Sequence, residues 1–285
     1  MNENLKNKVC LITGATNGIG LEAAKSLNKM GAEIVFIARN KEKAEKLQQE
    51  LMSETGREAT AIIADLSSLS EVKKAADQFL SLDKPLHILL NNAGIMNRER
   101  AETVDRLEEV FSVNHLAYFT LTLLLIEKMI ESGGKRIVNV ASMAYRFIKE
   151  INFDDLQSKE SYAPMKVYGQ SKMANILFTK SLANKLESKG ITVNCLHPGF
   201  VDTGIGSSNK GIRKFLFKLA SVFAKKTHKG AETSIYLCSS PEVENISGEY
   251  FVDCKIDELI GSVKSAEQAE KLWSVSSELT GVDLN

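Results

Sequence analysis

A tyrosine and a lysine four residues apart could carry proton-transfer chemistry in this chain. On a helix, Tyr168 and Lys172 would lie on one face, because residues four apart are neighbours along the helix. A free phenol ionises near pH ~10, so acid or base chemistry near neutral pH requires a pKa lowered by roughly three units, about 4 kcal/mol. A fixed ammonium group in a partly dehydrated site contributes to an effect of that size. Tyr168 would then take a proton from an alcohol or give one to a carbonyl.

Ser142 offers the oxygen-binding group that such chemistry needs. It follows the apolar run 136–141, and its hydroxyl would hold the substrate oxygen by a hydrogen bond. The Tyr-x-x-x-Lys pattern alone is a weak signal, since many helices contain it by chance as a surface pair with a partly buried ring. The elements around the three residues therefore decide the interpretation.

A glycine loop at residues 13–20, Thr-Gly-Ala-Thr-Asn-Gly-Ile-Gly, follows the first strand-like run. Its glycines Gly14, Gly18 and Gly20 have the spacing Gly-x-x-x-Gly-x-Gly. Absent side chains let the backbone approach a pyrophosphate, whose charge is met by the N-terminus of the next helix. The alternative is a turn that only links strand to helix. A dinucleotide loop and an activatable phenol on one chain indicate hydride transfer, with the positive nicotinamide ring helping to acidify the phenol.

The residues after the second and third strands bear on the choice of cofactor. An NAD-preferring site usually has Asp or Glu after the second strand, where a carboxylate repels a 2′-phosphate. This chain has Ala38 and then Arg39, and a guanidinium can clamp a phosphate through two hydrogen bonds. The sequence therefore predicts NADP(H), although Arg39 could instead pair with Glu42 or Glu45. Asp65, after the third strand, could accept from an adenine amino group or cap the next helix.

Composition favours a globular protein without nucleic-acid partners. The 285 residues are 44% hydrophobic and 25% charged, with 36 basic and 36 acidic residues, so no global field attracts a polyanion. The four cysteines are scattered and the histidines show no metal-like clustering, so we expect no metal site. Residues 1–8 contain no signal-peptide core, and Asn114 and His115 interrupt the apolar stretch near 110–126, which reads as a buried helix. We expect a cytoplasmic protein.

Strand-like runs alternate with helical patterns along the chain. The runs lie at 9–12, 33–38, 59–64, 86–90, 136–140, 191–195 and 249–252. This alternation predicts an α/β fold: a single doubly wound, Rossmann-type parallel sheet of about seven strands with helices on both faces. No linker, repeat or low-complexity segment marks a boundary, so residues 1–285 are interpreted as one domain. Such sheets bind ligands at the carboxyl ends of their strands, where the strand order reverses.

Together these residues resemble the short-chain dehydrogenase/reductase superfamily over nearly the whole chain. The matching features, in order, are the Thr-Gly-x-x-x-Gly-Ile-Gly loop, Asp65, Asn91-Asn92-Ala93-Gly94, Asn114, Ser142, Tyr168, Lys172 and the Pro198-Gly199 turn with Thr203. Within the superfamily the chain is most similar to the retinol dehydrogenase-like group. That similarity lies in Ala38-Arg39-Asn40, Ile95-Met96, the stretch 112–116, Leu196-His197-Pro198-Gly199 and the stretch 247–255.

The resemblance implies a catalytic tetrad of Asn114, Ser142, Tyr168 and Lys172. Asn114 would hold a water that links Lys172 to solvent; the alternative is a polar break satisfied inside a long helix. Asn91 would brace the central sheet. The full set of expected cofactor-binding residues, from the loop and from the resemblance, is Gly14, Thr16, Asn17, Gly18, Ile19, Gly20, Arg39, Asp65, Leu66, Asn92, Ala93, Gly94, Tyr168, Lys172, Pro198, Gly199, Val201 and Thr203. Residues 92–94 would line the adenosine ribose, and Thr203 would bond the nicotinamide carboxamide.

Residues 204–230 are the segment in which the resemblance implies a lid over the substrate. Apolar residues repeat there at helical spacing with cationic residues between and beyond them, namely Ile212, Phe215, Leu216, Leu219, Val222 and Phe223 among Lys210, Arg213, Lys214, Lys218, Lys225 and Lys226. Such a stripe could cover a lipophilic substrate. The basic segment 210–226 could also rest on an anionic membrane surface.

Two functions compete for this sequence. The first is an NADP(H)-dependent oxidoreductase that transfers a hydride between the nicotinamide and a lipophilic alcohol, aldehyde or ketone, retinoid-like or other. The second is a non-catalytic NADP-binding sensor or protein-interaction module. The intact tetrad favours the enzyme, because a sensor has no need of all four residues. The resemblance also implies a homodimer or tetramer, formed through helices near 101–130 and 163–188.

Overall fold

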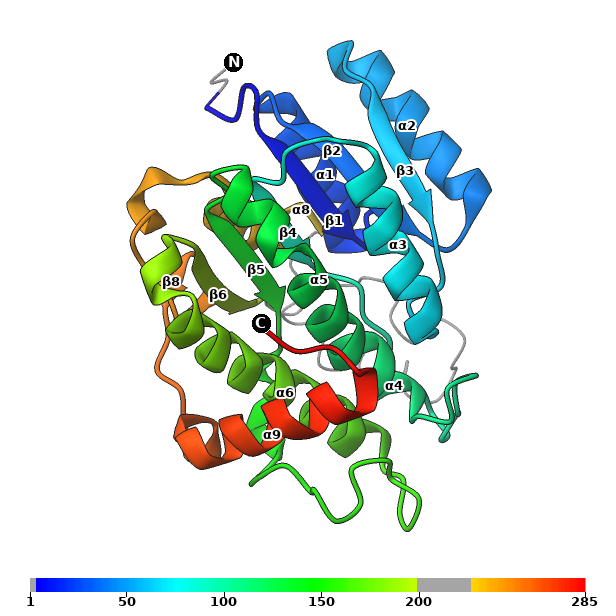
Figure 1. Ribbon diagram of the computed structural model, residues 1–285, viewed down its shortest axis with the longest axis vertical. Coiled ribbons are helices and arrows are strands. Elements are labelled where there is room, and N and C mark those ends of the chain that lie inside the picture. The colour runs from blue at the N-terminus through cyan, green and yellow to red at the C-terminus, as the bar shows by residue number, and fades with distance from the viewer. Residues whose placement is uncertain (1–3, 199–226, 285) are drawn as a thin grey trace.

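One sheet of eight strands forms the centre of the molecule (Figure 1). The computed structural model describes residues 4–198 and 227–284. The strands are β1 (Val9–Thr13), β2 (Glu33–Ala38), β3 (Ala59–Ile63), β4 (Ile88–Asn91), β5 (Arg136–Val140), β6 (Thr192–His197), β7 (Tyr250–Val252) and β8 (Lys255–Ile256). Their order is β3-β2-β1-β4-β5-β6-β7-β8, and all neighbouring pairs are parallel except β7 with β8. The predicted parallel sheet is confirmed.

Helices cover both faces of the sheet. They are α1 (Gly18–Lys29), α2 (Lys41–Thr55), α3 (Leu69–Ser81), α4 (Glu109–Phe111), α5 (Ala117–Glu131), α6 (Pro164–Lys185), α8 (Thr227–Ser239) and α9 (Ala266–Thr280), with short 3₁₀ turns at Met143–Phe147, Glu187–Lys189, Pro241–Val243 and Gly261–Lys264. One apolar core joins α1, α2 and α8 to the sheet, and a second joins α3, α5 and α6 to the other face (Figure 1). The central strands β1, β2, β4, β5 and β6 are therefore buried on both sides, which explains their near-continuous apolar runs.

β8 is the strand that the sequence pattern did not predict. It pairs with β7 across a two-residue turn formed by Asp253 and Cys254. Both residues have positive φ, 49° and 62°, as a tight hairpin with the normal twist of paired strands requires. No Asn-Gly or Asp-Gly pair marks this turn, so its sequence signal is weak.

The long apolar segment Glu109–Glu131 is a core helix. It runs through α4, a π-helical turn at Ser112–Leu116 and α5. Its length and composition would allow a membrane crossing, but 89% of its apolar window is buried inside the protein. The interpretation of the stretch near 110–126 as a buried helix is confirmed.

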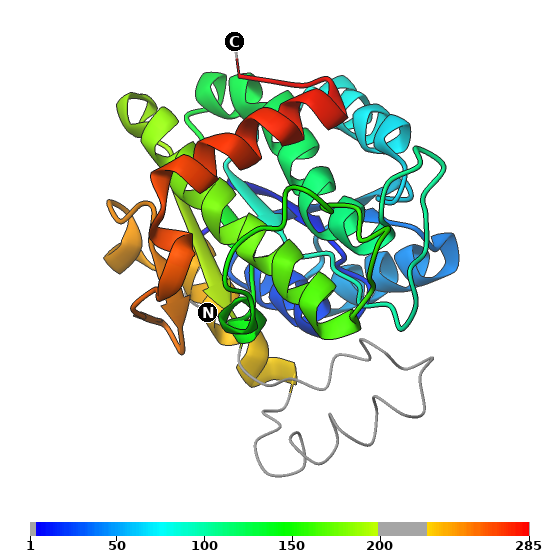
Figure 2. The ribbon, with the colours of Figure 1, turned by 90° about the horizontal axis from the view of Figure 1, so that it is seen from below.

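α9 lies across the outer faces of α5 and α6 (Figure 2). The ring of Trp273 lies 5.1 Å from that of Phe119 in α5 and 5.9 Å from that of Phe178 in α6, centroid to centroid. The ammonium group of Lys185 stands 4.7 Å above the same indole. α9 thus packs on two of the helices through which subunit pairing was expected.

Candidate active site

Three loops meet at the carboxyl edge of the sheet. The glycine loop follows β1, residues 92–94 follow β4, and Ser142 follows β5. These strands are neighbours in the order β1-β4-β5, and the chain order reverses between β1 and β4. A reversal of this kind is the place at which doubly wound sheets bind ligands.

The glycine loop is packed too closely to accept side chains at two positions. A Cβ on Gly20 would lie 2.3 Å from the carbonyl oxygen of Gly14 and 2.4 Å from Nδ2 of Asn92. Gly14 has φ 70°, and a Cβ there would lie 2.9 Å from Cα of Ala93. The loop therefore needs its glycines for contact with residues 92–93. The case for pyrophosphate binding therefore rests on the position of the loop at the start of α1.

Thr13 and Asn92 lock the loop to the end of β4. The backbone N–H groups of Asn92 and Ala93 donate to Oγ1 of Thr13 at 2.9 and 3.0 Å, and Nδ2 of Asn92 donates to the carbonyl oxygens of Thr13 and Gly14 at 2.9 and 3.2 Å. The side chain of Asn92 is thus directed at the loop. Asn91 donates to Oγ1 of Thr122 and Oδ1 of Asn139, both at 2.9 Å, and braces the sheet as predicted.

The N-terminus of α1 faces this same edge of the sheet. Asn17 caps the helix by accepting from the backbone N–H of Gly18 at 2.9 Å, and Ile19 is buried beneath the first turn while Thr16 is half-buried. The first turn of α1 carries no acidic side chain. The positive end of the helix dipole can therefore attract an anion without competition from a neighbouring carboxylate.

Arg39 and Asp65 lie at the ends of β2 and β3. Nη1 of Arg39 is 3.7 Å from Oδ2 of Asp65, and the arginine side chain is 74% exposed. Asp65 also accepts from the backbone N–H of Ser67 at 2.9 Å, whereas Ser68 caps α3. The alternative in which Asp65 caps that helix is therefore wrong, and Leu66 is a buried residue of the same turn. The long contact to Asp65 leaves the guanidinium at the surface of the site.

Tyr168, Lys172 and Ser142 are brought together as the spacing predicted. Both members of the Tyr-Lys pair lie on α6, where Nζ of Lys172 stands 5.7 Å from the ring centroid of Tyr168. Tyr168 forms a hydrogen bond with Ser142, which follows β5. Nζ of Lys172 donates to the carbonyl oxygen of Val140 at 2.9 Å, within the same strand end. An acid or base, its electrostatic partner and an oxygen-binding hydroxyl therefore share one site.

Burial moves the two titrating groups in opposite directions. It lowers the pKa of Lys172 to about 7, and it raises the pKa of Tyr168 to about 12 against the hydrogen bond with Ser142, which acts to lower it. The acidic phenol expected from the sequence needs the positive nicotinamide ring as well as Lys172, so it stays a prediction. Lys172 faces the ring of Tyr168 and donates to the carbonyl oxygen of Val140.

Asn114 lies in the π-helical turn at Ser112–Leu116 and is completely buried. Its Oδ1 accepts from the backbone N–H of Ile95 at 2.8 Å, while its Nδ2 donates to the carbonyl oxygen of Ile95 and to Oγ of Ser171 at 3.0 and 2.9 Å. A Cβ on Gly94 would be 3.4 Å from both Oδ1 of Asn114 and Nζ of Lys172. Asn114 thus links the loop after β4 to α6, the catalytic helix, which carries Tyr168 and Lys172.

The last part of the predicted site lies outside the described residues. Pro198, half-buried, follows β6 at the same edge of the sheet. Gly199, Val201 and Thr203 are not among the described residues, nor are residues 204–226 of the expected lid with its basic segment 210–226.

Tyr118 is a site residue that sequence reasoning missed. Its hydroxyl donates to the carbonyl oxygen of Ala93 at 2.7 Å, and its ring centroid lies 5.8 Å from Nζ of Lys172. The spacing of four residues from Asn114 was an available signal, because it places both side chains on one side of a helix. Tyr118 therefore forms part of the wall around Lys172.

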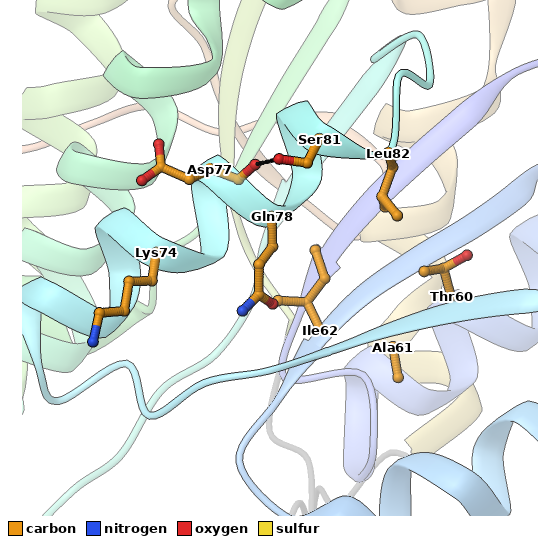
Figure 3. A pocket seen from close by; sticks show the side chains of 8 residues that line it. All are labelled: Thr60, Ala61, Ile62, Lys74, Asp77, Gln78, Ser81 and Leu82. Atoms are coloured by element: carbon orange, nitrogen blue, oxygen red, sulfur yellow. Dashed lines mark hydrogen bonds between the residues drawn. The ribbon is translucent and has the colours of Figure 1, made fainter.

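An open groove lies elsewhere on the molecule, between β3 and α3 (Figure 3). Thr60, Ala61 and Ile62 form its strand side, and Lys74, Asp77, Gln78, Ser81 and Leu82 its helix side. None of these residues belongs to the glycine loop or to the tetrad, so the groove is separate from the candidate active site.

Comparison with known proteins identifies the family. Residues 8–211 match the family model for short chain dehydrogenases. Retinol dehydrogenase 12 of Mus musculus is 39% identical over 282 residues, which cover 99% of this chain and 89% of that protein. A solved protein from Mycobacterium paratuberculosis has a TM-score of 0.78 at 28% identity, covering 99% of this chain and 96% of its own.

A short chain dehydrogenase from Burkholderia cenocepacia, solved in complex with NADP, has a TM-score of 0.70 at 28% identity, covering 87% of this chain and 96% of its own. These matches agree with the geometry of the glycine loop and of Tyr168, Lys172 and Ser142. The chain therefore belongs to the short-chain dehydrogenase/reductase family of oxidoreductases, in its retinol dehydrogenase-like group.

Proposed function

We propose that this protein is an NADP(H)-dependent oxidoreductase that moves a hydride between the nicotinamide and a lipophilic alcohol or its aldehyde or ketone. The meeting of Tyr168, Lys172 and Ser142 beside the glycine loop is the observation that carries the proposal. Bound NADP(H) supplies or accepts the hydride, and the protein's residues handle the proton.

Tyr168 is the proton-transfer residue of this proposal. In reduction its O–H donates a proton to the carbonyl oxygen while the hydride joins the carbon, and the phenolate regains a proton from solvent. In oxidation the phenolate takes the hydroxyl proton of the alcohol. The positive charge of Lys172 stabilises the phenolate, and Ser142 donates a hydrogen bond to the substrate oxygen.

Arg39 supports NADP(H) over NAD(H). Its guanidinium is largely exposed at the end of β2, and its ion pair with Asp65 is long at 3.7 Å. A charge held this loosely can turn to a 2′-phosphate, which two parallel hydrogen bonds would then clamp. The NADP complex of the relative from Burkholderia cenocepacia agrees with this choice.

The names of the relatives support a lipophilic, retinoid-like substrate, since the similar mouse protein is a retinol dehydrogenase. The lid at 204–230, the membrane contact through 210–226 and a cytoplasmic location stay predictions. The same holds for a homodimer or tetramer. A reduced NADP pool makes carbonyl reduction the expected direction.

The test is consumption of NADPH with a panel of retinoid and straight-chain aldehydes, with Tyr168→Phe as the matched variant. We expect the wild type to reduce at least one aldehyde and Tyr168→Phe to lose about 1,000-fold in kcat, as removal of an acid or base does. Fluorescence titration should show NADPH binding in both proteins. Binding without turnover of any aldehyde by the wild type would favour the sensor or interaction module instead.

A further inference from the structure

Three buried polar side chains form a chain from α9 to the catalytic helix. Oγ of Ser276 in α9 lies 2.8 Å from Nε2 of His115, and Nδ1 of His115 lies 3.3 Å from Oδ1 of Asn175 in α6. Nδ2 of Asn175 donates to the carbonyl oxygens of Asn114 and Val140 at 2.9 and 3.3 Å. Ser276, His115 and Asn175 are each completely buried. We name these three residues the α9 relay.

The hydrogen-bond donors of the α9 relay run in one direction. The carbonyl groups of Asn114 and Val140 can only accept, so the amide nitrogen of Asn175 faces them and its oxygen faces His115. His115 must then donate from Nδ1 and accept at Nε2, which makes the hydroxyl of Ser276 a donor. Burial lowers the pKa of His115 to about 4, so the ring is neutral and holds this single tautomer at neutral pH.

The α9 relay ends on the atoms that hold Lys172. The carbonyl oxygen of Val140 accepts from Nζ of Lys172 at 2.9 Å and from Nδ2 of Asn175 at 3.3 Å. A carbonyl oxygen has two lone pairs, and these two donors occupy them. The same amide group of Asn175 fixes the carbonyl of Asn114 in the π-helical turn. Loss of this amide would remove one hydrogen-bond donor from each of these two carbonyl groups next to the catalytic lysine.

We infer that Asn175 is a positioning residue for Lys172 and Asn114, and that His115 and Ser276 hold it in place, so that α9 is part of the catalytic architecture. This inference rests on the proposed function. The α9 relay is not needed to pack α9 on the protein, because Trp273 already contacts the aromatic rings of α5 and α6. Buried polar groups are costly unless they are all bonded, and every donor and acceptor pair in the relay is met.

The test compares variants at both ends of the α9 relay with a matched control. Asn175→Ala removes the amide that contacts the site, and Ser276→Ala removes the distant donor with a smaller change in packing. Ser276→Thr keeps the hydroxyl. The control is Ser181→Ala, because Ser181 also links α6 to α9, through Glu270 at 3.4 Å, without touching the relay.

We expect Asn175→Ala to lower kcat for aldehyde reduction by about 100-fold, with KM changed less than about threefold, since misplacement of a catalytic group acts on turnover. Ser276→Ala should lose about threefold to tenfold, and Ser276→Thr should regain most of it. In Asn175→Ala the carbonyl oxygen of Val140 accepts from Lys172 alone, which favours the charged form of the lysine. The midpoint of the pH dependence of kcat should therefore rise by about half a unit. The groups facing Lys172 are Tyr168 and Tyr118, which both variants retain.

NADPH affinity measured against pH provides a second readout that needs no substrate. If the wild type reduces no aldehyde, the proposed function fails, and the pH dependence of NADPH binding still reports on Lys172. The inference is overturned if both relay variants keep the wild-type kcat and pH midpoints, or if Ser181→Ala changes them equally. A melting temperature that falls without these changes would show that the relay only stabilises the fold.

Discussion

The cofactor edge and the catalytic helix are held by different kinds of contact. At the cofactor edge, the backbone of Gly14 and Gly20 packs against residues 92–93, where a Cβ would overlap neighbouring atoms. At the catalytic helix, Lys172 and Asn114 are held by hydrogen bonds between buried side chains and carbonyl groups. The cofactor edge depends on glycines that have no side chain. The catalytic helix depends on the hydrogen-bond donors and acceptors of its buried side chains. Substitutions should therefore damage the two regions in different ways.

Gly20→Ala should have the largest effect, because it adds an atom 2.3 Å from the carbonyl oxygen of Gly14. Neither that oxygen nor Asn92 can move freely, so the loop must shift. We expect NADPH affinity to fall by at least about 100-fold, roughly 3 kcal/mol. Fluorescence titration measures it. Gly56→Ala is the control, because a Cβ at that position would meet no atom within 4 Å. Placing alanine at its φ of 69° costs only about 1 kcal/mol of stability. Equal binding losses in both variants would contradict the steric account.

His115 should make the catalytic side sensitive to acid. Burial lowers its pKa from 6.5 to about 4 in the folded protein, so the unfolded chain takes up a proton first as the pH falls. The neutral ring therefore contributes fully to the free energy of unfolding above about pH 6.5. This contribution falls as the pH decreases from about 6.5 to about 4, by up to about 3 kcal/mol. Urea unfolding at both pH values should show this loss in the wild type and much less of it in His115→Gln. The same loss in both proteins would place the acid sensitivity elsewhere.

Arg39→Ala should have the smallest effect and should act on one cofactor only. Its side chain is 74% exposed, so solvent weakens its contribution to about tenfold in NADPH affinity, near 1.4 kcal/mol. NADH affinity should stay within about twofold, and added salt should shrink the difference. Lys41→Ala, an exposed cation at the start of α2, is the control. A parallel loss of NADH affinity would argue against contact with a 2′-phosphate.

The residues of the cofactor edge could be predicted from sequence because local patterns mark them. The glycines of the loop lie close together in sequence, and Arg39 and Asp65 each follow a strand. The capping alternative for Asp65 was wrong because Ser68 takes that position at the start of α3. A shift of three residues within a turn, from Asp65 to Ser68, is beyond what such patterns specify.

The catalytic side could be predicted only in part. His115 was dismissed for lack of metal-like neighbours, yet it bonds Ser276, which is 161 positions away. No local periodicity connects such residues, because α9 brings them together only in the folded chain. Burial, which raises the pKa of Tyr168 to about 12 in the protein alone, depends on this same packing and could not be predicted from the spacing. The spacing in the sequence predicted that Tyr168 and Lys172 lie together, whereas their pKa values depend on burial by residues that are distant in sequence.

The pH dependence of aldehyde reduction tests most directly the claim that a buried, charged Lys172 assists Tyr168. The quantity to measure is the single-turnover rate of NADPH oxidation from about pH 5 to about pH 10. Because burial lowers the pKa of Lys172 to about 7, its charge is lost as the pH rises through that value. The wild-type rate should therefore fall above about pH 7, and Lys172→Met should be slow at every pH, without that fall. A flat wild-type profile, or the same fall in Lys172→Met, would contradict the account.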